Sequence, residues 1–295
     1  MGIFFNKQRE KSPVGKGKVI SFLNQKGGVG KTTMAFNTAH ALAQGGAKVL
    51  CIDMDPQSNL SYLFNIDVNE TGATSIFQLL INSVRELKPL HRAAIWTDVL
   101  CREGDIDILP AGQELSGLEL TVAGINGARQ LILKKFIELN SLKTVYDYII
   151  IDGPPTLGLI VVNILCASDG AIVPFRPDDF SRKGLNHFYE VLEDISDMGV
   201  SQIPEVLAHI PNLVDSRRKQ ESDDLLKIKN SLDEHFGGQA VVTAPFLNKA
   251  QLVKSQSQKK SVYDYASKEF LPLQGQFNDM AQIIKDWSKE SHSEH

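Results

Sequence analysis

A lysine and two threonines follow a glycine-rich run near the start of the chain, in a spacing that suits phosphate binding. Because glycine has no Cβ, successive backbone N–H groups of such a run can turn toward one anion. Lys31 is placed to reach the β- and γ-phosphates of a nucleotide, and the Thr32 hydroxyl is placed to bind Mg²⁺. We therefore predict a nucleotide-binding loop made of Lys26, Gly27, Gly28, Val29, Gly30, Lys31, Thr32 and Thr33.

This loop is flanked by the two elements that such a site requires. Residues 18–23 form an apolar, β-branched run of strand length. Residues 33–44 repeat apolar side chains at helical spacing without glycine or proline, and Gly45 and Gly46 mark the end of that helix. The unpaired N–H groups and the dipole at a helix N-terminus favour a bound anion. The alternative is a glycine-rich turn that merely contains a lysine, and it leaves this strand–loop–helix order unexplained.

Two further apolar runs end in carboxylates. Residues 49–52 lead to Asp53 and Asp55, and residues 148–151 lead to Asp152, followed by Gly-Pro-Pro. Ligands of open α/β sheets gather at the carboxyl ends of the strands, so we expect these side chains near the phosphates. Asp152 would hold the Mg²⁺ shell opposite Thr32. Alternate spacing directs Asp53 and Asp55 differently, and the alternative for both is capping of the next element.

In their residues and their order, these motifs resemble the ParA/MinD family of ATPases over about residues 18–288. Gln25 occupies the first glycine position of the ordinary Walker A pattern, and Lys26 adds a second lysine, which is the deviant Walker A form. The resemblance implies that Lys26 reaches across a dimer interface to the partner's nucleotide. It also implies that Asp55 polarises the attacking water and that Asp53 supports the Mg²⁺ shell. The alternative for Lys26 is a solvated loop charge.

The order of elements predicts the fold class. We expect an α/β protein of the P-loop NTPase type, with a doubly wound, mostly parallel sheet and helices on both faces. We expect one ATPase domain over residues 18–288 and a polar tail over 289–295. Residues 1–17 carry four basic residues and one acidic residue, which predicts a basic, flexible leader. The alternative role for that leader is contact with DNA, a membrane surface or a partner.

Several local assignments follow from pattern alone. We predict a helix over residues 129–142, a helix over 185–198 that Ser181 caps, a helix over 225–236 and a late strand over 240–243. Residues 86–102 could form helix or irregular cover. Asn212 ends an apolar strand that also contains His209, which we expect in the core. The resemblance implies that Asn212 recognises the adenine edge, whereas the alternative is an Asx-turn.

Composition limits the remaining function classes. The chain has 295 residues and a formal net charge of −4, so any DNA contact must come from a local basic patch. No apolar run reaches 18 residues, so no membrane-spanning helix is expected. Three widely separated cysteines suit a reducing cytoplasm. No cysteine follows the carboxylates of the two strands, which disfavours an iron–sulfur reductase on the same fold.

Basic residues gather in two stretches of the second half of the chain. The resemblance implies non-specific DNA binding through the C-terminal stretch, and lysines beside hydroxyl and amide groups suit phosphate contacts without base readout. The alternative is a solvated surface loop. The candidate DNA-binding residues are Arg217, Arg218, Lys249, Lys254, Lys259 and Lys260.

The resemblance as a whole implies an ATPase that uses ATP and Mg²⁺ and forms an ATP-dependent homodimer. A ParB-like protein or a cargo adaptor would stimulate hydrolysis, and the dimer would position a plasmid, a chromosome region or other cargo on the nucleoid, in the bacterial cytoplasm. One alternative is a MinD-like ATPase that cycles on a membrane, for which the apolar stripe of residues 277–287 would be a targeting helix rather than core. Another is an ATP-binding polar-localisation scaffold with little turnover.

Overall fold

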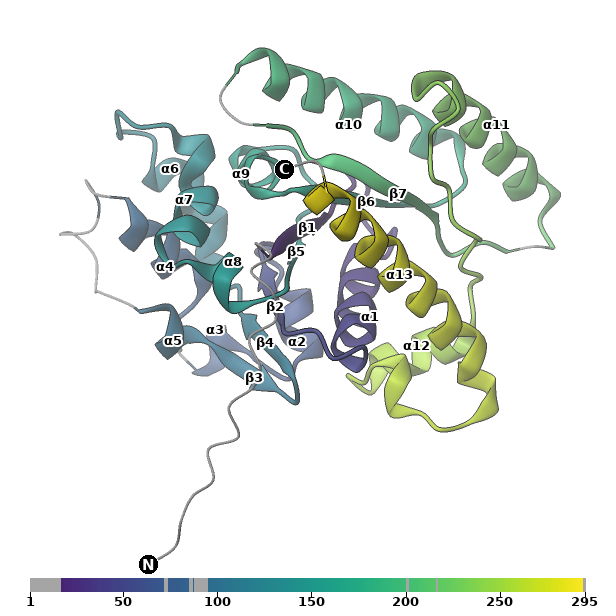
Figure 1. Ribbon diagram of the computed structural model, residues 1–295, viewed down its shortest axis with the longest axis horizontal. Helices are drawn as coiled ribbons and strands as arrows, with labels where there is room; N and C mark the ends of the chain where they lie inside the picture. Colours follow the sequence, from purple (N-terminus) through teal and green to yellow (C-terminus); the bar gives the residue numbers. More distant parts are fainter. Residues whose placement is uncertain are drawn as a thin grey trace, which may run out of the picture.

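A seven-stranded sheet forms the centre of the molecule, in the order β3-β4-β2-β5-β1-β6-β7. β3 runs antiparallel to β4, and the other neighbouring strands of the described chain run parallel. Helices cover both faces of the sheet (Figure 1). The predicted doubly wound α/β fold is therefore confirmed. The strands are β1 (Lys18–Phe22), β2 (Val49–Asp53), β3 (Cys101–Glu103), β4 (Ile106–Leu109), β5 (Tyr148–Asp152), β6 (Gly170–Phe175) and β7 (Glu205–Pro211).

This computed structural model describes residues 17–71, 74–84, 87, 95–199, 202–215 and 217–293. The predicted leader therefore lies outside the described residues except for Gly17. Within segment 86–102, residue 86 and residues 88–94 also lie outside them. The described end of that segment forms a short helix over Trp96–Val99, in agreement with the helix alternative, and then strand β3, which neither alternative predicts. The short antiparallel strand gave no alternating pattern by which it could be recognised.

One face of the sheet is covered by a continuous series of helices, from the third helix after β2 to the first helix after β7. Side chains such as Leu50, Ile149 and Val173 point from the strands into this core, where Phe136 and Phe188 meet them. The helices on this face are α4 (Ile76–Ser83), α5 (Trp96–Val99), α6 (Leu118–Thr121), α7 (Ile132–Leu139), α8 (Leu142–Val145), α9 (Leu159–Ala167), α10 (Asp179–Asp197) and α11 (Lys219–His235).

The opposite face carries the helix of the predicted phosphate loop. α1 lies beside the last helix, α13 (Figure 1). Phe277, Met280 and Ile284 of α13 are fully buried against this core, so the predicted core packing of the stripe is confirmed. α13 continues past position 288, so the predicted tail begins inside a helix. The helices on this face are α1 (Lys31–Gln44), α2 (Asn59–Leu63), α12 (Ala250–Ser257) and α13 (Leu271–Ser293), and α3 (Val68–Thr71) follows α2.

Three local predictions are wrong, two in their boundaries and one in its type of element. The predicted helix 129–142 breaks after Leu139, because Asn140 donates from its side chain to the Phe136 carbonyl and Ser141 has a φ of 51°. Residues 240–243 form no strand but one isolated bridge, which joins Val242 to His209. α11 begins at Lys219 rather than at residue 225.

Asp178, and not Ser181, caps α10. Asp178 has an extended backbone, and its carboxylate accepts from the Ser181 backbone N–H at 2.9 Å. The cap therefore lies where the chain leaves β6, and the helix begins earlier than predicted. This cap places the Asp178 side chain at the edge of the sheet where the parallel strands end.

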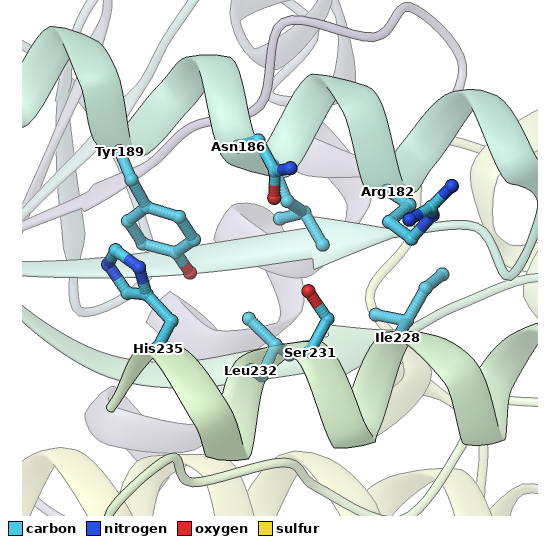
Figure 2. A pocket seen from close by; sticks show the side chains of 8 residues that line it. Arg182, Asn186, Tyr189, Ile228, Ser231, Leu232 and His235 are labelled. Atoms are coloured by element: carbon cyan, nitrogen blue, oxygen red, sulfur yellow. The ribbon is translucent and has the colours of Figure 1, made fainter. Parts of the chain in front are cut away.

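α10 and α11 lie side by side and leave a shallow groove between them (Figure 2). Arg182 and Asn186 face it from α10, and Ser231 and His235 face it from α11. Tyr189 packs below, and its hydroxyl donates to Nε2 of the buried His209. Nδ1 of that imidazole lies 3.2 Å from the Val241 carbonyl, so a neutral ring protonated on Nδ1 satisfies both contacts. His209 thus lies in the core, as predicted, and its burial lowers its pKa to about 4.

Candidate nucleotide-binding site

The predicted loop and the predicted carboxylates meet at the carboxyl edge of the sheet. β5 lies between β1 and β2, and Asp152 is in register with Phe22 on one side and with Asp53 on the other. The loop that follows β1 therefore passes directly beside both aspartates. Parallel pairing alone brings together residues that are 99 and 130 positions apart in the sequence.

The loop adopts a conformation that only glycine takes up without strain. Gly28 and Gly30 have φ values of 71° and 93°. A Cβ on Gly30 would lie 2.2 Å from Nδ2 of Asn212, so the close approach of Asn212 also requires glycine. α1 begins immediately afterwards at Lys31, so its N-terminal N–H groups face the loop.

Thr32 and Asp152 form the pair that was predicted to hold Mg²⁺. The Thr32 hydroxyl donates to Oδ2 of Asp152 at 2.6 Å. Asp152 is fully buried, and its other oxygen, Oδ1, has no hydrogen-bond partner among the described residues. A buried carboxylate oxygen without a donor is costly, and a bound cation would remove that cost.

Asp53 is also fully buried, but its oxygens are occupied. Oδ2 accepts from the backbone and side chain of Ser61 at 2.8 and 2.7 Å, and Oδ1 accepts from the backbone of Asp55 at 3.1 Å. Ser61 in turn accepts from the Ala111 N–H at 3.0 Å. These contacts favour a supporting role for Asp53, which orients the loop that carries Asp55, over direct contact with a metal. Sequence reasoning missed Ser61, since no local motif marks it.

The buried charges of the site do not balance. Burial raises the pKa of Asp152 well above its usual value, and the charge of Asp53 acts in the same direction. Burial also raises the pKa of Asp53 to about 6, although hydrogen bonds from Ser61 oppose this. Lys31 is the buried cation beside these groups, and burial lowers its pKa although Asp152 and Asp55 oppose this. The described site therefore holds more buried carboxylate than buried ammonium.

This donor set fits Mg²⁺ and a nucleotide. A hydroxyl and a carboxylate oxygen are ligands that Mg²⁺ prefers, and a divalent cation offsets the excess of carboxylate. Asn212 donates to the Val29 carbonyl at 2.8 Å, whereas its buried Oδ1 has no partner among the described residues. That oxygen can accept an N–H group, as an adenine amine would supply. The prediction for Asn212 therefore has a chemical basis, and an Asx-turn is not needed to explain the residue.

Asp55 follows Asp53 and is almost buried, with 6% of its surface exposed. Its Oδ1 accepts from the Gln57 backbone at 2.9 Å, which fixes the direction of the carboxylate. Lys31 lies close enough for the charge of Asp55 to affect its pKa. Asp55 is thus an oriented carboxylate at the phosphate loop, which is what its predicted role with water requires.

Lys26 is held by its own chain. Its ammonium group forms an ion pair with the carboxylate of Asp178, the residue that caps α10. Although partial burial opposes it, the hydrogen bonds from Lys26 and Ser181 lower the pKa of Asp178. The solvated-charge alternative therefore does not describe Lys26 in the single chain. Its predicted reach across a dimer stays a prediction.

Comparison with known proteins places this site in a family. The family model of the AAA domain matches residues 17–204, more than half of the chain. The chromosome partitioning protein ParA of Caulobacter vibrioides is 34% identical over 178 residues, which are 60% of this chain and 63% of that protein. The chain belongs to the ParA/MinD family of ATPases.

Solved structures agree with this family in fold. The ATP complex of McdA from Cyanothece has a TM-score of 0.77 at 22% identity, and the match covers 92% of this chain and 97% of that one. Cobyrinic acid a,c-diamide synthase from Mycobacterium smegmatis, bound to an ATP analogue and magnesium, has a TM-score of 0.72 at 26% identity, with 92% and 95% covered. Proteins with the fold of the ParA/MinD family thus bind a nucleotide together with Mg²⁺.

The candidate DNA-binding residues of this family member differ in their surroundings. Arg217 and Arg218 both pair with Asp215, and Arg218 also pairs with Glu221. In contrast, no carboxylate of the described chain lies within ion-pair distance of the C-terminal lysines. Those lysines are Lys249, Lys254, Lys259 and Lys260, on or next to α12.

The helices of the described chain bear on the MinD-like alternative, in which the protein would cycle on a membrane. No helix of the described chain is both long and apolar enough to cross a bilayer, and the stripe of α13 faces the core. The predicted absence of a spanning helix is thus confirmed for the described residues.

Proposed function

We propose that this chain is a MgATP-dependent ATPase that dimerises on ATP, binds DNA non-specifically and positions a cargo. The observation that carries the proposal is the Thr32–Asp152 pair, buried beside Lys31 with one carboxylate oxygen left over. We assign the activity to residues 18–288 and place the protein in the bacterial cytoplasm on the nucleoid. Family membership supports ATPase activity in general.

Each side chain has a role that its contacts support. Lys31 would bind the β- and γ-phosphates together with the backbone N–H groups of residues 27–33. Mg²⁺ would neutralise the phosphate charge when bound, with Thr32 and Asp152 as its ligands. Asp55 would orient and polarise the attacking water, and Asp53 would hold Asp55 in place. Asn212 would accept from the base.

Lys26 supplies the link between hydrolysis and dimerisation in this proposal. It would leave Asp178 and bind the nucleotide of the partner chain, so that the two sites are complete only in the dimer. Each charge of the Lys26–Asp178 pair is about a third exposed (31% and 32%), so the pair costs little to break. A ParB-like protein or cargo adaptor would then stimulate turnover.

The lysines on and beside α12 support DNA as the surface that the dimer binds. No carboxylate of the described residues lies within ion-pair distance of them, and Lys254 and Lys260 are exposed. Contacts of this type bind phosphates without reading bases. The buried stripe of α13 disfavours the membrane-cycling alternative, because those side chains already pack against α1. The intact Lys31, Thr32, Asp55 and Asp152 disfavour a scaffold without turnover.

One experiment separates these candidates. The full chain is sedimented with DNA and, separately, with anionic liposomes, in the presence of ATP, ADP or no nucleotide. We expect ATP-dependent co-sedimentation with DNA and none with liposomes. If liposomes sediment the protein in ATP while DNA does not, the membrane-cycling function replaces the one proposed. ATP binding without turnover, even with DNA and a cognate partner present, would favour the scaffold.

A further inference from the structure

α12 is bonded directly to the first turn of the helix that carries the phosphate loop. Gln256 donates from its side-chain amide to the hydroxyl of Thr33. Leu252 and Ser255 are buried on the same side of α12, whereas Val253 and Lys254 are exposed on the other. One face of this short helix therefore contacts the loop, and the opposite face carries basic charge.

A second bond lies one helical turn further along α1. Asn37 is almost fully buried; its Oδ1 accepts from the Val262 N–H at 2.9 Å, and its Nδ2 donates to the Thr33 carbonyl at 2.9 Å. Thr33 and Asn37 thus hold the two ends of segment 256–262. Lys259 and Lys260 lie between these ends, where Lys259 has a φ of 52° and Lys260 donates from its backbone to Ser255.

The hydroxyl of Thr33 can serve two neighbours at once. It accepts from Gln256, and its own proton remains available to an acceptor on the loop side. A nucleotide phosphate is such an acceptor, and a hydroxyl that already accepts a hydrogen bond is polarised as a donor. A bound phosphate and Gln256 would therefore strengthen each other's contact with Thr33.

We propose that Gln256 is a positioning residue that couples nucleotide binding to the basic segment formed by residues 249–260. Only the part of this inference that concerns DNA rests on the proposed function. A nucleotide bound to Thr33 strengthens the hydrogen bond from Gln256 to Thr33. Asn37 holds the other end of the turn through the Val262 N–H. With both ends held, the backbone that carries the lysines of the basic segment keeps a single conformation. Coupling is reciprocal, so DNA on the segment raises nucleotide affinity by the same factor.

The test compares Gln256→Leu with Gln251→Leu, a glutamine on the same helix whose side-chain amide donates to Glu269. We expect Gln256→Leu to weaken ATP binding about two- to tenfold, the range of one neutral hydrogen bond. In hydrogen exchange, the ATP-induced protection of the Lys260 and Val262 amides should disappear, although the thermal midpoint without nucleotide stays that of Gln251→Leu. The ratio of DNA affinities with and without ATP should also fall, and by linkage it should fall by the same factor as the ratio of ATP affinities with and without DNA.

Conservative variants of the acceptor give an independent check. Thr33→Ser keeps the hydroxyl and should keep the ATP-induced protection, whereas Thr33→Val should abolish it. The inference is rejected if Gln256→Leu binds ATP like Gln251→Leu and retains that protection. If the unaltered chain binds no DNA in any nucleotide state, the DNA part of the proposed function fails, but ATP affinity and hydrogen exchange still decide the role of Gln256.

Discussion

Lys26 and Asp178 form an ion pair within one chain, although 152 positions separate them in the sequence. The pair connects the phosphate loop to the first turn of α10, so the same carboxylate caps a helix and holds a lysine of the loop. A lysine held in this way is withheld from any partner molecule. Dimerisation through Lys26 would therefore compete with Asp178.

Asp178→Asn tests this competition. Asparagine still caps α10 but carries no charge, so the ion pair with Lys26 is lost while the helix cap is kept. We expect the ATP-dependent dimer to form at about two- to fivefold lower protein concentration, which is the range for a partly exposed ion pair. Sedimentation equilibrium in ATP measures this. Asp194→Asn on the exposed side of α10 is the matched control, and an equal effect of both substitutions would show that Asp178 does not restrain Lys26.

Asp55→Ala should separate ATP binding from hydrolysis. Loss of a carboxylate that orients water is expected to lower turnover about 10²- to 10⁴-fold. ATP should still bind and hold the dimer, because Lys31, Thr32 and Asp152 are unchanged. Phosphate release and nucleotide binding are measured side by side, with Asp279→Ala as a surface control. Unchanged turnover would remove Asp55 from the role proposed for it.

The basic residues should differ in their effect on DNA binding. Lys259→Glu with Lys260→Glu is expected to lower DNA affinity and to reduce the slope of log affinity against log salt by about one for each DNA phosphate that the variant no longer binds. Arg217→Glu should have a smaller effect, since Asp215 already neutralises Arg217. Binding to a DNA duplex in ATP across a salt series distinguishes the two. If substitution of Lys259, Lys260 and Arg217 lowers DNA affinity equally and only slightly, the two lysines belong to the solvated surface and do not bind DNA.

His209 should make stability depend on pH in mildly acidic solution. Its folded pKa of about 4 lies below the usual 6.5, so the unfolded chain binds more protons between these values. The free energy of unfolding therefore receives the whole contribution of the neutral ring above pH 6.5, and this contribution is lost as the pH falls toward 4. At pH 5 we expect a loss of about 2 kcal/mol relative to pH 7.

Denaturant unfolding of His209→Gln measures that contribution. Glutamine keeps an acceptor for Tyr189 but does not titrate, so its loss between pH 7 and pH 5 should be smaller by about the same amount. The exposed His187→Gln is the control and should match the unaltered chain. A pH profile of His209→Gln that parallels the control would show that another group causes the acid sensitivity.

The sequence predicted the parts of the site that are local in the chain. The loop from Lys26 to Thr33 and the strand-end aspartates follow from glycine spacing and apolar runs, and parallel pairing then brings them together. Asp178 and Gln256 could not be found in this way. Their partners lie 152 and 223 positions away, and the contacts depend on how α10 and α12 pack on the sheet.

The wrong local predictions have a similar origin. The run that ends at Leu139 looks helical and apolar, yet Leu139 is 72% exposed at the end of α7, where Asn140 and Ser141 turn the chain. Val242 belongs to a β-branched run, but one bridge to His209 is all the pairing that the run makes. Propensity marks these segments correctly as ordered, and tertiary contacts decide their form.

The central position of β1 has a consequence for synthesis of the chain. In the described structure β1 is hydrogen-bonded to β5 and β6, whose residues begin at Tyr148 and Gly170. During synthesis β1 therefore waits for the later strands β5 and β6, and its apolar run is unpaired in the meantime. α13, which covers α1, emerges after all seven strands of the described sheet. Nascent chains that stop before β5 should be aggregation-prone and unable to bind ATP, and the nucleotide site is complete only after Asn212 has been synthesised.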